Sequence, residues 1–181
     1  MEKTLVIHPD DRSTDFLKPI YSGIKGKMVV TGGHYGKNTI RKLIEISDRV
    51  IMLGHGSPYG LFSVGRFSDC TNGYIVDNTM IEALEYKLNN IYIWCHANQF
   101  VERHKLNGFY SGMFISEYGE ANACGVGTYE GEIEQSNDLF SEIVGKNINT
   151  DSQLLCEIAK QEYYIHDSKV NEYNNTRLNW K

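Results

Sequence analysis

Two residues that could carry out nucleophilic chemistry stand at the ends of apolar segments. Residues 50–53 lead through a glycine to His55, and residues 91–94 lead directly to Cys95. Each segment is typical of a buried strand, so each side chain would be delivered at the carboxyl end of a strand. A thiol beside an imidazole is the smallest set of groups that can act as a cysteine nucleophile with its own general base or acid.

Alternating strand and helix patterns position these two residues. We expect strands at residues 4–8, 27–31, 49–54, 90–95 and 108–116. We expect helices at residues 15–21, 38–47, 78–88, 97–106, 130–144 and 150–164. Such alternation predicts an α/β fold, a three-layer α/β/α sandwich around a mostly parallel five-stranded sheet. A caspase-like or flavodoxin-like strand order of 2-1-3-4-5 would place His55 and Cys95 at adjacent strand tips.

Chain length, composition and net charge limit the classes of protein to which this sequence can belong. The chain has 181 residues, of which 41% are hydrophobic, so we expect one domain over residues 1–181 that is helical from about residue 130. The tail from Asp167 is polar, and we expect it to be frayed apart from Trp180. A net charge of -5 without a basic stripe argues against nucleic-acid binding. No run approaches the roughly 18 apolar residues of a membrane span, and the chain does not begin with a signal peptide, so we expect a cytoplasmic protein that binds no membrane.

Cysteine and histidine spacing gives no reason to expect a metal. The four cysteines, at positions 70, 95, 124 and 156, contain no Cys-x-x-Cys pair, so we expect thiols rather than a disulfide scaffold or a zinc knuckle. His34, His55 and His96 would share one edge of the sheet, but they lack the short spacing of a zinc site. We therefore predict no metal and no cofactor.

The order of hydrophobic strand, His-Gly, helix, hydrophobic strand and Cys resembles the caspase-like superfamily of cysteine peptidases, which includes caspases, gingipains, clostripain, legumain and separase. The matching positions are His55, Gly56 and Ser57 in one segment and Cys95 in the other, and the resemblance covers roughly residues 4–120. It implies attack by the Cys95 thiolate on a peptide carbonyl and protonation of the leaving amine by His55. It also implies an oxyanion hole formed by the backbone N–H groups of Gly56 and Cys95.

The chain departs from this family at several places. Trp94 precedes the cysteine where the family usually has a small residue, and residues 96–98 lack the glycine that often follows it. The Gln-Ala-Cys-x-Gly motif of caspases is absent, and the C-terminal third lacks evident strands that would build a primary substrate pocket. These departures favour one alternative, a catalytically inactive caspase-like domain that acts as a binding or interaction module.

A peptide or protein is the expected substrate, and loops at the same sheet edge would supply its binding site. The candidate substrate-binding residues are Ser57, Tyr59, His34, Asn98 and Glu117. The polar, glycine-rich stretch 57–73 would serve as a lid or wall. Asp10, Asn98 and Glu117 could each orient an imidazole or bind a basic substrate group, or simply form turns and caps. Glu120 belongs to an acidic patch expected at a solvated helix start. The oligomeric state is left open.

A glycine-rich stretch at residues 31–39 suggests a second alternative, a flavodoxin-like nucleotide-binding domain. It follows a strand and precedes a helix, so backbone N–H groups there could bind an anion. The spacing is not that of a phosphate-binding P-loop, because three residues rather than four separate Gly32 from Gly36, and Asn38 follows the lysine. A tight strand-to-helix turn is the simpler interpretation.

Overall fold

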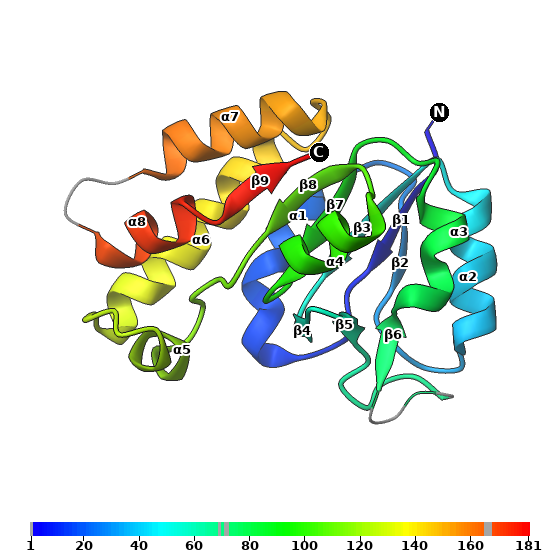
Figure 1. The fold of residues 1–181 in the computed structure, drawn as a ribbon, viewed down its shortest axis with the longest axis horizontal. Coiled ribbons are helices and arrows are strands. Elements are labelled where there is room, and N and C mark those ends of the chain that lie inside the picture. The colour runs from blue at the N-terminus through cyan, green and yellow to red at the C-terminus, as the bar shows by residue number, and fades with distance from the viewer. Residues whose placement is uncertain (1, 69, 71–72, 165–167) are drawn as a thin grey trace.

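A computed structural model describes residues 2–68, 70, 73–164 and 168–181. Its centre is a six-stranded, mostly parallel sheet with the order β2-β1-β3-β7-β8-β9 (Figure 1). These strands are β1 (Thr4–Ile7), β2 (Met28–Val30), β3 (Arg49–Leu53), β7 (Asn90–Ile93), β8 (Gly108–Ser111) and β9 (Leu178–Trp180). A small antiparallel sheet contains β4 (Gly56–Ser57), β5 (Gly60–Phe62) and β6 (Tyr74–Val76).

Helices follow most of the strands. The α-helices are α1 (Lys18–Ser22), α2 (Lys37–Ile46), α3 (Ile81–Leu84), α4 (Ala97–His104), α5 (Tyr118–Ala123), α6 (Glu130–Lys146), α7 (Ser152–Tyr163) and α8 (Lys169–Asn175). Two short 3₁₀ helices, η1 (Arg12–Leu17) and η2 (Asn78–Met80), precede α1 and α3. Figure 1 shows α5, α6, α7 and α8 gathered toward the side of the molecule where β9 lies.

The central strands are buried on both faces, which explains their continuous apolar sequence. In β3, Val50 and Met52 belong to one hydrophobic cluster, and Ile51 and Leu53 belong to another. The first cluster includes side chains of α2, α3 and α4, and the second includes side chains of α1, α6 and α7. The predicted α/β/α sandwich is therefore confirmed, with helices on both faces of a mostly parallel sheet.

The predicted order of the first five strands is confirmed, but the expectation of a frayed tail is wrong. Residues 169–175 form α8, and β9 pairs antiparallel with β8, which makes a sixth strand. Leu178, opposite Ser111, is fully buried in the second cluster. A single buried leucine among polar neighbours gives no local hydrophobic pattern, because its burial depends on the strand it pairs with.

The end of the helix predicted over residues 78–88 also differs from the structure. The expected helix over 78–88 ends at Leu84, and Tyr86 and Leu88 lie exposed beyond it. The chain turns there through Asn89, whose φ is 58°, before β7 begins. The stretch 57–73, for which we expect a lid or wall, includes the end of β4 and all of β5, which pair as an antiparallel hairpin.

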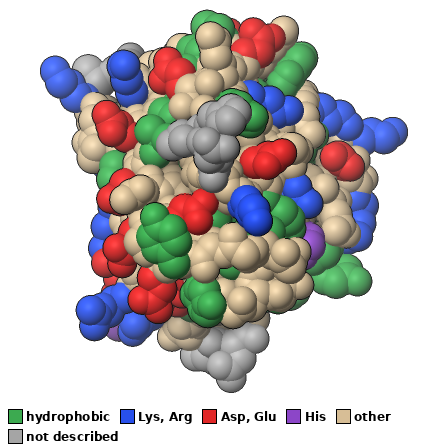
Figure 2. Space-filling model, turned by 90° about the vertical axis from the view of Figure 1, so that its left-hand side faces the viewer, with side chains coloured by type: hydrophobic (Ala, Val, Ile, Leu, Met, Phe, Trp, Pro, Cys, Tyr) green, Lys and Arg blue, Asp and Glu red, His purple; other side chains and the backbone are tan. Residues whose placement is uncertain are grey.

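The surface carries charges of both signs. On the face shown in Figure 2, acidic and basic side chains are interspersed rather than gathered into one patch. Within the part of the chain that the structure describes, no helix is both long enough and apolar enough to cross a membrane.

Candidate functional site

The parallel pairing of β3 with β7 brings His55 and Cys95 to the same edge of the sheet. Leu53 pairs with Ile93, so each of the two residues lies two positions beyond a matched pair. Gly54 makes the turn after β3 with a φ of 137°, and its N–H donates to the carbonyl of Ile93. The sheet therefore places the imidazole and the thiol at equivalent positions on neighbouring strand ends.

His55 and Cys95 line one small cavity of about 20 Å³, which is room for roughly one water molecule. Its other lining residues are Thr14, Phe16, Leu17, Gly54, Ile93, Trp94, Phe114 and Ser116. The walls are mostly apolar and come from η1, the ends of β3 and β7, and the segment after β8. The cavity brings the predicted pair together but is too small for a peptide side chain in this conformation.

The Cys95 thiol faces a carboxylate. Its Sγ lies 3.6 Å from Oε1 of Glu120 and 3.7 Å from the carbonyl oxygen of Phe114, and both of these atoms are acceptors. Burial, and then the charge of Glu120, raise the pKa of the Cys95 thiol to about 12. No hydrogen bond joins Cys95 to His55 among the described residues. The thiol is therefore protonated at neutral pH in this conformation.

Glu120 is held in place by the start of α5. Its Oε2 accepts from the Ser116 N–H at 2.7 Å, the Ser116 hydroxyl at 3.0 Å and the Glu117 N–H at 3.1 Å. Glu117 and Glu120 form a capping box at the beginning of that helix. The sequence pattern predicts a solvated acidic patch for Glu120, whereas the structure places its carboxylate against the thiol. The Glu-x-x-Glu spacing could have indicated the cap, but not the cysteine beside it.

The His55 imidazole contacts residues that follow β1. Its Nε2 lies 2.7 Å from Oγ of Ser13 and 4.0 Å from Oδ2 of Asp11. The Ser13 hydroxyl donates to Oδ1 of Asp11 at 2.9 Å. Asp10 is one of the residues that we expect could orient the imidazole, but Asp10 is exposed and it is Asp11 that lies beside the ring.

Gly56 and Trp94 are packing partners. A Cβ on Gly56 would lie 2.2 Å from Cδ1 of Trp94, so only glycine fits there. The indole is 2% exposed, stacks edge-on against Tyr92 and Phe100, and donates through Nε1 to the carbonyl of Ser57 at 3.1 Å. The tryptophan before the cysteine therefore fills the α4 side of the sheet and anchors the segment that follows His55.

The candidate substrate-binding residues lie outside the cavity lined by Cys95 and His55. The Ser57 hydroxyl pairs with the Tyr74 hydroxyl at 2.8 Å. Tyr59 is exposed beneath the Arg103 guanidinium, in a separate hollow of about 470 Å³. His34 is exposed in the loop after β2, Asn98 lies in the first turn of α4, and Glu117 is the exposed N-cap of α5.

The glycine-rich segment after β2 is closely packed. The Gly33 N–H donates to the carbonyl of Arg66 at 2.7 Å, and a Cβ on Gly32 would lie 2.7 Å from that same oxygen. Both glycines have positive φ, at 153° for Gly32 and 88° for Gly33. Close approach of the chain near Arg66 therefore accounts for these glycines without a bound phosphate.

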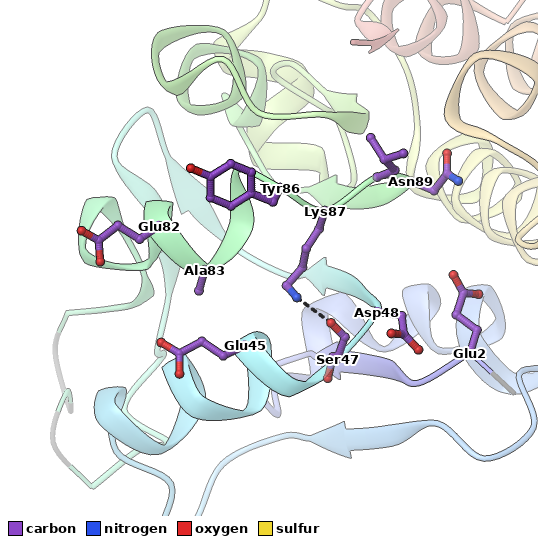
Figure 3. Close-up of a pocket in the computed structure, with 10 residues that line it drawn as sticks. Glu2, Glu45, Ser47, Asp48, Glu82, Ala83, Tyr86, Lys87 and Asn89 are labelled. Carbon is purple, nitrogen blue, oxygen red and sulfur yellow. Dashed lines mark hydrogen bonds between the residues drawn. The ribbon is translucent and has the colours of Figure 1, made fainter.

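A larger hollow of about 590 Å³ lies at the opposite, amino-terminal edge of the strands (Figure 3). Its lining includes Glu45, Asp48 and Glu82, and the Lys87 ammonium donates to the carbonyl of Ser47. It contains none of the candidate site residues. Across residues 2–68, 70, 73–164 and 168–181, no three His, Cys, Asp or Glu side chains are grouped as a metal site requires.

Comparisons with known proteins add no assignment to this geometry. No protein-family model matches the chain, and a search of functionally curated proteins finds no match.

Proposed function

We propose that this protein is a cysteine-dependent hydrolase of peptide or amide bonds, with Cys95 as nucleophile and His55 as general acid and base. The observation that carries the proposal is the shared cavity at the ends of β3 and β7, which brings a thiol and an imidazole together. The resemblance of the His-Gly and Cys positions to caspase-like peptidases supports the same assignment.

The reaction would proceed through an acyl-enzyme. His55 takes the proton of the Cys95 thiol, and the thiolate attacks the substrate carbonyl carbon to give a tetrahedral oxyanion. The backbone N–H groups of Gly56 and Cys95 would stabilise this oxyanion. Collapse breaks the carbon–nitrogen bond as His55 returns the proton to the leaving amine. Water, deprotonated by His55, then hydrolyses the thioester and restores the thiol.

The resting conformation requires a change before this reaction. The thiol points to Glu120, its pKa is raised to about 12, and the cavity is of water size. Substrate binding would have to widen the cavity at Phe114 or Phe16 and turn the thiol from Glu120 toward His55. Catalytic hydrogen bonds are often long in unliganded sites and tighten only in the complex.

Labelling by a peptide electrophile tests the nucleophile. We expect a panel of peptidyl acyloxymethyl ketones to modify the wild-type chain at Cys95, and the Cys95→Ala variant to lose this labelling completely. Cys124→Ala, which removes another partly exposed thiol, is the matched control and should be labelled as wild type is. Circular dichroism would check the fold of each variant. Equal labelling of wild type and Cys95→Ala would overturn the assignment.

One observation favours a second candidate, a non-catalytic binding module of the same fold. A protonated, half-buried thiol next to a carboxylate is poorly suited to nucleophilic attack. If folded wild-type protein resists every electrophile at neutral pH, and also cleaves no member of a peptide library, the binding module replaces the hydrolase.

A further inference from the structure

Three hydrogen-bonded side chains, Asp11, Ser13 and His55, form a row that ends at the cavity shared by His55 and Cys95. Asp11 and Ser13 follow β1, whereas His55 follows β3, and the two strands are neighbours in the sheet. The contacts between them are short, at 2.9 Å from Ser13 Oγ to Asp11 Oδ1 and 2.7 Å from Ser13 Oγ to His55 Nε2. The role proposed for Asp11 and Ser13 rests on the proposed function of Cys95 and His55.

Counting the protons available on Asp11, Ser13 and His55 identifies which group donates each hydrogen bond. A serine hydroxyl has one proton, and an ionised carboxylate can only accept. Hydrogen bonds from Ser13 lower the pKa of Asp11, which is therefore ionised at neutral pH. If the hydroxyl proton points to Asp11, Ser13 must accept from His55, so the ring carries its proton on Nε2. That leaves Nδ1 as the nitrogen with a free lone pair.

Local structure fixes Asp11 and Ser13 in place. Asp11 is the N-cap of η1, and its Oδ1 also accepts from the Ser13 N–H at 3.0 Å. Its carbonyl accepts from the Thr14 N–H at 3.1 Å and from the Thr14 hydroxyl at 3.0 Å. The Thr14 hydroxyl in turn pairs with Nε2 of the buried His8 at 3.1 Å. The loop is thus tied to the end of β1, which gives His55 a rigid partner.

We propose that Asp11 and Ser13 are positioning residues that hold His55 as the Nε2–H tautomer, so that Nδ1 exchanges the proton with Cys95. When Nδ1 takes the thiol proton, the ring becomes a cation. Asp11 Oδ2, 4.0 Å from Nε2, then lies close enough to stabilise that charge. The pair therefore orients the ring before the reaction and offsets its charge during it.

The tautomer can be measured without any assay of activity. In the full chain labelled with ¹⁵N-histidine, long-range ¹H–¹⁵N spectra at about pH 8, where an ordinary imidazole is neutral, report which nitrogen carries the proton. We expect His55, assigned through a His55→Gln variant, to be Nε2–H in wild type. Ser13→Ala should give a mixture of tautomers, and Ser13→Thr, which keeps the hydroxyl, should restore the wild-type pattern.

The control is Asp10→Asn, which changes the neighbouring exposed carboxylate and should leave the spectrum as in wild type. An Nδ1–H form of His55 in wild type, or identical spectra of wild type and a folded Ser13→Ala variant, would overturn the inference. Because the spectrum can also be recorded on Cys95→Ala, this outcome is separate from a failure of Cys95 to react. In an active enzyme, Ser13→Ala should lower kcat by roughly tenfold or more with little change in KM, and Ser13→Thr should restore it.

Discussion

The charge facing Cys95 is the residue-scale feature that most affects its reactivity. A thiolate formed at this position would lie 3.6 Å from the Glu120 carboxylate oxygen, and like charges at such distances disfavour ionisation. Because three donors from the start of α5 hold the other oxygen of Glu120, the carboxylate cannot turn away without loosening that helix start. The reactivity of the thiol is thereby coupled to the conformation of α5.

Glu120→Gln should lower the pKa of the Cys95 thiol below its wild-type value of about 12. The pKa should stay above that of an ordinary thiol, because burial is the larger cause and remains in the variant. At about pH 9 we expect iodoacetamide to modify Cys95 roughly three- to tenfold faster in the variant, since alkylation follows the thiolate fraction. Mass spectrometry of the Cys95 peptide measures this rate.

Glu117→Gln is the matched control for this prediction. Glu117 belongs to the same capping box, so both variants replace one carboxylate by an amide at the start of α5. No hydrogen bond joins Glu117 to the thiol among the described residues. Equal alkylation rates in the two variants would show that the charge of Glu120 does not set the pKa of the thiol.

At the scale of elements, η1 and α1 are joined to β1 through a buried histidine. His8 pairs with the Tyr21 hydroxyl through Nδ1 and with the Thr14 hydroxyl through Nε2, both at 3.1 Å. Burial, and then the charge of Lys18, lower the pKa of His8 from 6.5 to about 4. The imidazole therefore stays neutral in the folded chain under conditions in which an unfolded chain would protonate it.

This depressed pKa predicts a loss of stability in acid. Below about pH 6.5 the unfolded chain binds a proton at His8 that the folded chain binds only near pH 4, so the free energy of unfolding falls across that window. The difference corresponds to about 3 kcal/mol. Between pH 7 and pH 4, the free energy of unfolding of His8→Gln should therefore fall by about 3 kcal/mol less than that of wild type. Urea unfolding of both proteins at each pH measures this difference.

Exposed His34 supplies the comparison for His8. His34→Gln should follow the wild-type pH dependence, since His34 lies in an exposed loop. If His8→Gln also follows the wild-type curve, then His8 does not contribute to acid unfolding.

At the scale of the whole molecule, β9 closes the sheet with residues from the far end of the chain. Leu178 lies opposite Ser111 and enters the cluster that also contains Phe109, Phe140 and Leu155. An unpaired β8 would present a free edge, which in many proteins leads to association of copies. The C-terminal segment therefore completes both the sheet and one of its two hydrophobic faces.

Leu178→Ala should lower the free energy of unfolding by about 2–5 kcal/mol, because it leaves a cavity beneath β9. Asn179→Ala, in the same strand but exposed, should change it by less than about 0.5 kcal/mol. Chemical denaturation of both variants measures the difference. A small and equal effect of the two substitutions would mean that β9 contributes little to the stability of the sheet.

Much of the sheet could be predicted because a strand that is buried on both faces has a continuous run of apolar residues in its sequence. The strands ending before His55 and Cys95 are continuous apolar runs, and their parallel pairing follows from the helical pattern between them. By contrast, the helix expected over 78–88 ends early. Its apolar periodicity continues through Leu88, but among the described residues that side chain belongs to neither of the two large hydrophobic clusters, and it lies exposed.

The sequence by itself determined the first five strands of the central sheet, and that His55 and Cys95 follow neighbouring strands, since local hydrophobic pattern specifies buried strands and parallel strands end at one edge. Only the tertiary structure decided what surrounds those two side chains. Ser13 contacts His55, which lies 42 positions along the chain, and Glu120 contacts Cys95, which lies 25 positions away. The paths of the loops that carry Ser13 and Glu120 are set by caps and packing against the rest of the fold, which no local periodicity encodes.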